Sequence, residues 1–179
     1  MTQGLKRSFK LGLAFVAAAA VGHVGIVLAT PGALMQVAMK RMSHGGEIIN
    51  AFDFGARTTQ KSRWVVRPSP DLAYSSCVYD LSKGPLLIEA APSPGNGYVS
   101  LSVFDARTDN IAVFDSNQHP QGIRFVLARA GQATPPGAAV VISPSERGIV
   151  LDRRLAPSAE LFAAADKARR ADRCEPITG

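Results

Sequence analysis

YVSLSVFDARTDNIAVFDS, residues 98–116, alternates apolar and polar side chains with the two-residue period of a β-strand. In its first half Val99, Leu101 and Val103 share one face, while the intervening serines point to the other. A second apolar run, NIAVFDS, follows after a short polar segment. The stretch therefore predicts two strands joined by a polar turn, in a sheet with one buried side.

Similar short runs fill the chain beyond Asp71, and Gly, Pro, Asn and Asp residues separate them. No segment of helix length lies between the runs, which excludes a β-α-β architecture. We predict a mainly β fold, an antiparallel β-sandwich or barrel-like domain, with helices only at the ends. The runs read AYSSCVYD, PLLIEAA, YVSLSVFD, NIAVFDS, IRFVLAR, AAVVIS and GIVLD.

The short C-terminal helix is expected in PSAELFAAADKARR, residues 157–170. Proline at its start, an acid in its first turn and two arginines at its end suit the helix dipole. Leu161, Phe162 and Ala165 are expected to cover one edge of the sheet.

The basic charge of the chain is concentrated near its beginning. The 179 residues carry 20 basic and 14 acidic side chains, and five of the basic ones but none of the acidic ones precede residue 47. The remaining chain, with 15 against 14, is nearly neutral, so the pI of about 9.7 does not indicate nucleic-acid binding.

A transmembrane segment is predicted in this basic region. The uncharged run LGLAFVAAAAVGHVGIVLA begins at Leu11 and ends at Ala29, and as a helix it would span ~28 Å, close to the hydrocarbon core of a bilayer. Lys6, Arg7 and Lys10 precede it, so the positive-inside tendency predicts a single pass with a cytoplasmic N-terminus. The main domain is then expected on the periplasmic or other extracytoplasmic side.

A cleaved signal peptide is the alternative, because residues 27–29 fit the small-residue pattern of a cleavage site. The apolar run exceeds the usual signal core of about 7–15 residues, and ALMQVAMKRM continues a helix-compatible pattern beyond Pro31. The length therefore favours a retained anchor.

Cys77 and Cys174 follow this segment and none precede it, as expected for a chain exported to an oxidising compartment. They can form a disulfide, or Cys77 can be a buried strand residue and Cys174 a free thiol in the tail. The sequence leaves both open, and it predicts no metal site and no cofactor.

These patterns divide the chain into three parts. Residues 1–44 are expected to form the anchor and a juxtamembrane helix, and residues 72–179 the β-rich domain. Residues 45–71 read as a connecting region, with a short strand at residues 62–66.

Two motifs carry a resemblance to a known family. SPDLAYSSCVYDLSKGPLLIEAAP, followed by GYVSLSVFDARTDNIAVFDS, resembles the domain-of-unknown-function family 1254, with its tyrosine-rich strand, its Asp-Leu-Ser-x-Gly-Pro turn and a strand that ends in Asp before a polar turn. The similarity covers residues 69–116, and the anchor is similar to short membrane-anchored members. The resemblance implies an exported, β-rich domain, and it carries over no reaction.

Longer members of that family continue into a second domain, family 1214, which this chain lacks. The resemblance therefore suggests a protein partner that carries a family 1214-like domain. Physically, DLSKGP at residues 80–85 reads as a hairpin turn, in which Gly84 can adopt positive φ.

Weak candidates for catalysis lie between residues 105 and 119: Asp105, Arg107, Asp109 and His119. Carboxylates at one end of a sheet can form an acid/base pair, but Asp, Asn and Thr are also ordinary turn residues. The sequence thus leaves enzymatic activity open. It favours a membrane-anchored envelope protein that acts as a non-catalytic binding or assembly module, with an envelope hydrolase using the Asp105–His119 loop as the alternative.

Overall fold

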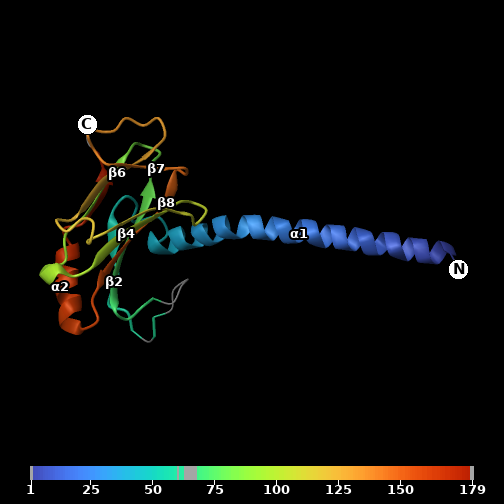
Figure 1. Ribbon diagram of the computed structural model, residues 1–179, viewed down its shortest axis with the longest axis horizontal. Helices are drawn as coiled ribbons and strands as arrows, with labels where there is room; N and C mark the ends of the chain where they lie inside the picture. Colours follow the sequence, from blue (N-terminus) through green and yellow to red (C-terminus); the bar gives the residue numbers. More distant parts are fainter. Residues whose placement is uncertain (1, 60, 63–67, 178–179) are drawn as a thin grey trace.

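The computed structural model describes residues 2–59, 61–62 and 68–177 of the chain. Within them, two β-sheets pack face to face, and a long N-terminal helix projects from one sheet (Figure 1). The elements are α1 (Thr2–Met42), β1 (Phe52–Phe54), β2 (Leu72–Asp80), β3 (Leu86–Ala90), a 3-10 turn (Pro94–Asn96), β4 (Val99–Phe104), β5 (Asn110–Asp115), β6 (Ile123–Arg129), β7 (Val140–Ser143), β8 (Arg147–Leu155), α2 (Ala159–Arg169) and β9 (Arg173–Pro176).

Sheet A has the strand order β1-β2-β8-β4-β5, and sheet B has the order β7-β6-β3-β9. All of the strand pairs are antiparallel except β6 and β7, which are parallel. The predicted β-sandwich is therefore confirmed, with one parallel pair and without a closed barrel. The seven predicted runs all form strands, whereas β1 and β9 are strands that the sequence did not predict.

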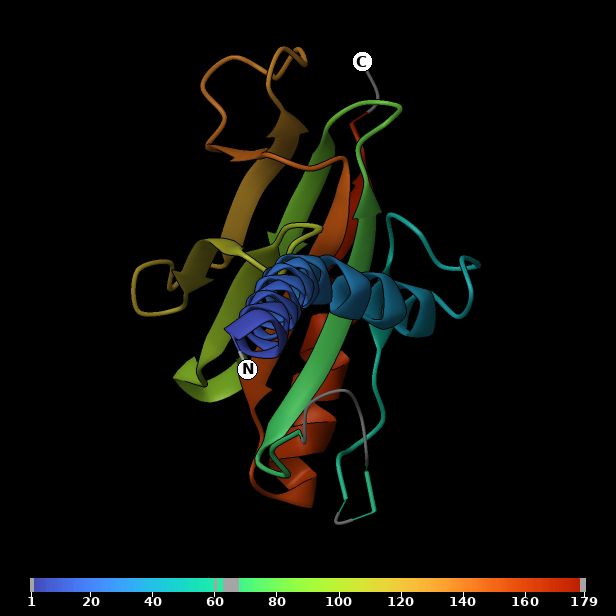
Figure 2. The same cartoon turned by 90° about the vertical axis from the view of Figure 1, so that its right-hand side faces the viewer.

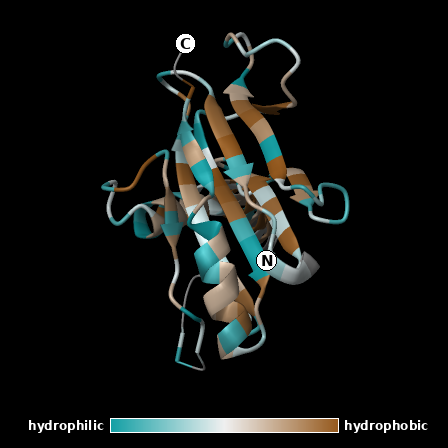
Figure 3. Ribbon diagram, turned by 90° about the vertical axis from the view of Figure 1, so that its left-hand side faces the viewer, coloured by the Kyte–Doolittle hydropathy of each residue, from teal (hydrophilic) through white to brown (hydrophobic). Residues whose placement is uncertain are grey.

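The core lies between the sheets. Leu101, Val103 and Val150 of sheet A face Ile88 and Leu127 of sheet B, and all five side chains are fully buried. In Figure 3, brown and teal bands alternate along the strands, as expected when only one face of a sheet meets the core. This packing makes the two sheets one domain.

A disulfide joins the sheets across the core. Cys77 lies on β2 of sheet A and Cys174 on β9 of sheet B, with a Cα–Cα distance of 6.5 Å. It closes a loop of 97 residues, which on the chain-entropy estimate stabilises the fold by about 4–5 kcal/mol. The tail thus ends in a paired, cross-linked strand.

Two local predictions were wrong. The turn after β2 keeps its predicted chemistry, because the backbone N–H of Ser82 donates to Asp80 and Gly84 has a φ of 142°. It is not a hairpin, however, since β2 and β3 belong to different sheets. The outer face of β4 is also covered rather than exposed: Ser100 and Ser102 are 3% and 0% exposed.

Helix α1 continues without a break through Pro31 and ends on the outer face of sheet A. Met35 and Met39 are each 5% exposed and pack on Val78 and Ile149. Figure 2, which looks along α1, shows the helix standing on sheet A. The segment Arg7–Met42 contains a window that is long and apolar enough to cross a membrane, and none of that window is buried.

Helix α2 packs across the end of sheet A. Ser158 caps it by accepting a hydrogen bond from the backbone N–H of Leu161 at 3.2 Å. Ala165 is buried and Phe162 is half-buried, as predicted, whereas Leu161 is 50% exposed and lies outside this cluster. The strand expected at residues 62–66 falls mostly on residues outside those that the structure describes.

Candidate functional site

The polar loop singled out in the sequence forms the tight connection between β4 and β5. The Asp105 carboxylate, 3% exposed, accepts hydrogen bonds from the backbone N–H groups of Arg107 at 2.7 Å and Asp109 at 3.0 Å. Thr108 has a φ of 71°, which the turn requires. Both bonds go to the same oxygen, Oδ1, so Asp105 closes the turn, while the side chains of Arg107 and Asp109 are exposed.

His119 lies at the other end of β5. Its backbone N–H donates to the carbonyl of Asp115 at 3.0 Å, and its ring meets Phe114 edge-on with the centroids 5.7 Å apart. Six residues of extended strand place this end about 17 Å from the Asp105 turn. The structure thus brings Asp105 and Asp109 together but not His119, and catalysis by this loop stays a prediction.

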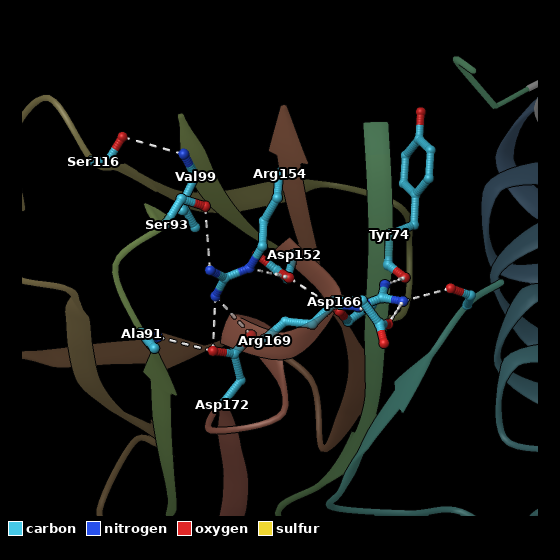
Figure 4. Close-up of polar contacts among 12 residues, drawn as sticks. Tyr74, Ala91, Ser93, Val99, Ser116, Asp152, Arg154, Asp166, Arg169 and Asp172 are labelled. Atoms are coloured by element: carbon cyan, nitrogen blue, oxygen red, sulfur yellow. Dashed lines mark hydrogen bonds and ion pairs between the residues drawn. The ribbon is translucent and has the colours of Figure 1, made fainter. Parts of the chain in front are cut away.

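A buried group of charges, which we call the arginine cluster, was not found from the sequence. It consists of Ser75 on β2, Asp152 and Arg154 on β8, Asp166 and Arg169 on α2, and Asp172 just before β9. The charged side chains of Arg154, Asp152 and Asp172 are completely buried. Figure 4 shows the cluster at the junction of sheet A, α2 and the chain leading to β9.

Arg154 lies between two carboxylates. Its Nη2 donates to both oxygens of Asp172, at 2.8 and 2.9 Å, and its Nε donates to Asp152 at 3.2 Å. Asp172 also accepts from the backbone N–H of Ala91 at 2.8 Å, and Asp152 accepts from Ser75 at 3.0 Å. One guanidinium thus ties β8 to the start of β9 and to the end of β3.

Burial of these carboxylates shifts their titration. Desolvation, together with repulsion from Asp152, raises the pKa of Asp172 to about 7. Burial also raises the pKa of Asp152, and its Oδ1 has no hydrogen-bond partner among the described residues. Two carboxylates that share one buried cation favour keeping a proton near neutral pH.

Arg169 holds the second half of the cluster. It is 1% exposed and donates to the backbone carbonyls of Tyr74 at 2.6 Å and Gly55 at 2.7 Å, while its Nε contacts Asp166 at 2.9 Å. The guanidinium therefore pins α2 to the backbone that follows β1 and to β2 (Figure 4). The side chains of Arg154, Asp152 and Asp172 are completely buried, whereas Asp166 is 31% exposed. The buried half of the cluster therefore acts as a structural clamp with a titratable carboxyl.

One sequence signal marked this cluster. Asp152 and Arg154 stand at alternate positions of a strand whose neighbouring inward residue is the core residue Val150. Alternate residues of a strand share a face, so an acid and a base two positions apart can pair on the buried side. Sequence reasoning ended this strand at Asp152 and so missed the pair.

A cavity of about 300 Å³ lies on the outer face of sheet A, beside the end of α1. Its polar lining includes Arg41, and His44 Nε2 lies 3.0 Å from Asp53 Oδ2. Ser76 and Leu151, which are cross-strand partners on β2 and β8, line the sheet side. The remaining lining residues are Ala38, Met42, Gly55, Tyr74 and Ser75. Among the described residues no group of three His, Cys, Asp or Glu side chains is placed to hold a metal ion.

Comparison with solved structures shows where this fold occurs. The chain is similar to the VPA0106 protein of Vibrio parahaemolyticus, with a TM-score of 0.60, 17% identity, and coverage of 85% of this chain and 38% of that one. A protein from Burkholderia cenocepacia gives a TM-score of 0.45 at 14% identity, with coverage of 87% and 40%. The chain thus spans about two fifths of the length of these proteins.

No curated protein matches the sequence. A family profile described as "Protein of unknown function (DUF1254)" matches residues 49–176, from just before β1 to the last residue of β9. The match covers nearly the whole β domain, including the two strands that the sequence pattern alone did not predict. The chain belongs to the DUF1254 family.

Proposed function

We propose that this protein is a single-pass membrane protein of the cell envelope, with a cytoplasmic N-terminus and its β domain outside the cytoplasm. The domain acts as a non-catalytic binding or assembly module together with a partner protein. The observation that carries the location is the continuity of α1, which is fully exposed and apolar over its first part and packed into the domain at its end.

Two features of α1 favour an anchor over a cleaved leader. The residues around the candidate cleavage site after Ala29 are helical, and the hydroxyl of Thr30 donates to the carbonyl of Ile26 at 2.7 Å within the helix. Met35 and Met39, within the next three turns, are already buried against sheet A. An apolar helix with no protein packed on it is more stable in lipid than in water.

The disulfide supports the extracytoplasmic side. Disulfides persist in oxidising compartments and are rare in the cytosol. The Cys77–Cys174 bond crosses the domain core, and both cysteines are buried, at 0% and 3% exposure. A structural cross-link of this kind fits a domain that folds after export.

Two observations support a partner. The same fold covers only 38% of the Vibrio parahaemolyticus protein, so there it is part of a larger chain. In the described part of this chain, the edge strands β5 and β7 carry exposed apolar side chains, Val113 (54%) and Ile142 (51%). Unpaired strand edges are templates for association with another chain. A separate protein with a family 1214-like domain is the partner that we propose.

Location is tested with reporters fused after residue 59 of the full chain. Alkaline phosphatase, which needs an oxidising compartment, should be active there, and a cytoplasmic fluorescent reporter should be dark. The mass of the mature chain should include residues 1–29. A mature chain that starts at Thr30 and is recovered in the soluble fraction would overturn the anchor.

The partner is tested by photo-crosslinking in intact cells. A crosslinking amino acid at Ile142, on the β7 edge, should give a discrete adduct that mass spectrometry identifies. Leu161 on α2 is the matched control, because its exposure of 50% is nearly that of Ile142. Equal adducts from both positions, or none from Ile142, would contradict a partner at this edge.

A further inference from the structure

The free edge of β5 is the least protected of the strand edges. Strands β1, β5, β7 and β9 each have a neighbour on one side only, within the part of the chain that the structure describes. β1 has three residues, β7 has four, and β9 carries Arg173, Glu175 and Pro176. β5 has six residues, NIAVFD, with one charge at its end and no proline. Natural proteins keep edge strands short, charged or interrupted by proline, because unpaired backbone groups bind other strands. An edge like that of β5 is therefore expected to have a partner.

The backbone of β5 shows which groups such a partner meets. The N–H of Ser116, just after β5, donates to the carbonyl of Val99 on β4 at 2.9 Å. Because the backbone groups of successive residues in a strand point to opposite sides, the N–H and C=O of Asp115 and Val113 face away from β4. The side chain of Val113, opposite Ser102, lies on the outer face of sheet A and is 54% exposed. Val113 thus presents its backbone groups to the open edge, next to an exposed apolar side chain.

A second copy of this chain fits the edge with Val113 at the centre. When two identical strands pair antiparallel in one sheet, their two-fold axis is perpendicular to the sheet, so each face continues into the same face of the other copy. Val113 opposite Val113 of the second copy meets this condition, and the two residues exchange both of their outward backbone hydrogen bonds. In this register each Asp115 lies opposite Ile111 and not opposite the other Asp115, so like charges are not paired.

The direction of α1 also suits two copies side by side. Figure 2 shows α1 end-on and the strands of sheet A face-on, so the helix projects roughly along the direction of that two-fold axis. Rotation about the axis leaves this direction unchanged, and both helices then enter one bilayer from the same side. α1 packs on β8, which β4 separates from β5. Five strand spacings of ~4.8 Å therefore separate the two helices by ~24 Å where they meet the domains.

We propose that β5 pairs with β5 of a second copy of this chain, which gives a two-fold symmetric dimer with sheet A continuous across both copies. A pair of six-residue strands buries little surface, so the dimer gains part of its stability from the high effective concentration of two copies held in one membrane. The inference goes beyond the partner tested above at the β7 edge. It rests on the proposed membrane anchor for the orientation and concentration of the two copies.

The first test is disulfide crosslinking of the full chain in phosphatidylcholine vesicles. Cys77 and Cys174 are bonded to each other, so an introduced cysteine supplies the free thiol. Val113→Cys should form a crosslinked dimer on mild oxidation, because the Cα atoms of opposed, hydrogen-bonded residues are ~5.5 Å apart. Leu161→Cys on α2, with a similar exposure of 50%, is the matched control and should stay monomeric, as should Gly25→Cys on α1.

Three outcomes of this experiment would overturn the proposal. The absence of a dimer from Val113→Cys would exclude pairing at this edge. Equal dimer from Val113→Cys and Leu161→Cys would show random collision in the vesicle. A dimer from Gly25→Cys alone would assign the association to the membrane helix, because helices ~24 Å apart cannot form a disulfide.

The second test asks whether Val113 faces its own copy. Val113→Lys should weaken the dimer at least about tenfold, measured by energy transfer between donor-labelled and acceptor-labelled chains in vesicles, because like charges then lie directly opposite. Val113→Asp should weaken it in the same way, and mixing the two variants should restore the energy transfer. Leu161→Lys should have no effect, and thermal melting should show that every variant is folded.

A dimer that persists in Val113→Lys, or no recovery in the mixture, would overturn the pairing of β5 with itself. The topology and mass measurements described above test the anchor separately. An anchored chain that stays monomeric therefore refutes this dimer alone.

Discussion

The raised pKa of the Asp172 carboxyl predicts an unusual pH dependence of the protein's stability. Measuring this dependence is the most direct test of the arginine cluster. The pKa of Asp172 is raised from 3.8 to about 7 in the folded domain, so between these values the folded state binds more protons than the unfolded state. The stability that Asp172 contributes is therefore fully present below about pH 4 and is lost as the pH rises toward 7. A shift of about 3 pH units corresponds to about 4 kcal/mol across the full window.

Groups with lowered pKa values act in a different window. The hydroxyl of Ser82 and the guanidinium of Arg147 hold the pKa of Asp80 below its usual value, so its contribution is lost only as the pH falls below about 3.8. Measurements between pH 4.5 and 7.5 therefore exclude Asp80 and report on the buried pair of Asp172 and Asp152, whose pKa values are both raised. Guanidinium chloride unfolding of the full chain in a non-ionic detergent, followed by far-UV circular dichroism, gives the free energy of unfolding at each pH.

The wild-type protein should lose stability steadily from pH 4.5 to 7.5, and Asp172→Asn should remove most of that slope. Asp71→Asn, on an exposed carboxylate, is the matched control and should keep the wild-type slope. The slope decides the test, so a change in absolute stability of the variant does not obscure it. A flat or rising wild-type profile, or the same slope in Asp172→Asn, would refute the reasoning.

Three further predictions concern packing. Arg154→Met should lower the free energy of unfolding by about 3–5 kcal/mol at pH 7.5, measured by the same unfolding curves, because it leaves buried carboxylates unpaired. The double variant Cys77→Ala, Cys174→Ala should lower it by up to about 4–5 kcal/mol, and a reducing agent should have no further effect on this variant. Gly148→Ala should cost at least about 3 kcal/mol in the thermal melt, because its Cβ would collide with the carbonyl of Phe104.

Each of these has a contrasting measurement. Replacing Arg154 together with both of its carboxylate partners by apolar residues should recover much of the loss, because breaking a buried pair costs more than removing it whole. For the disulfide, the contrasting measurement is on the wild-type protein under reducing conditions. Full stability there would contradict a stabilising cross-link. Gly25→Ala, with open space around it, is the control for Gly148, and an unchanged melt of Gly148→Ala would show that the strand can shift.

The strands that the sequence predicted best are those with turn-forming residues at their ends. IRFVLAR gave β6 with the observed bounds of Ile123–Arg129, because a glycine turn precedes it and polar residues follow. β1 was missed since FDF is only three residues long within a polar region, and β9 since RCEP contains a proline and no alternation. Such strands form because they pair with neighbouring strands. Pairing with a strand that is far away in the sequence leaves no recognisable pattern in the local sequence.

The same limit explains the site. The DLSKGP turn was recognised from its residues, but turn chemistry does not say whether the next strand joins the same sheet or crosses to the other. The arginine cluster depends on contacts between residues 75, 152, 154 and 172, whose charges read locally as a solvated face. Its burial follows only from the fold. The cavity likewise combines the end of α1 with β2, more than thirty residues later.

The unbroken path of α1 from its exposed part into the domain has a mechanical consequence. A flexible linker would let the β domain reorient freely relative to α1. Here the last turns of the helix pack on Val78 and Ile149, so helix and domain are coupled rigidly. With α1 as the membrane anchor proposed above, rolling or tilting of its part in lipid would turn the whole β domain by the same angle. A protein that binds at the edge strands β5 and β7 would then find them at a fixed distance from the bilayer and in a fixed orientation. This limits the geometries that such a complex can adopt.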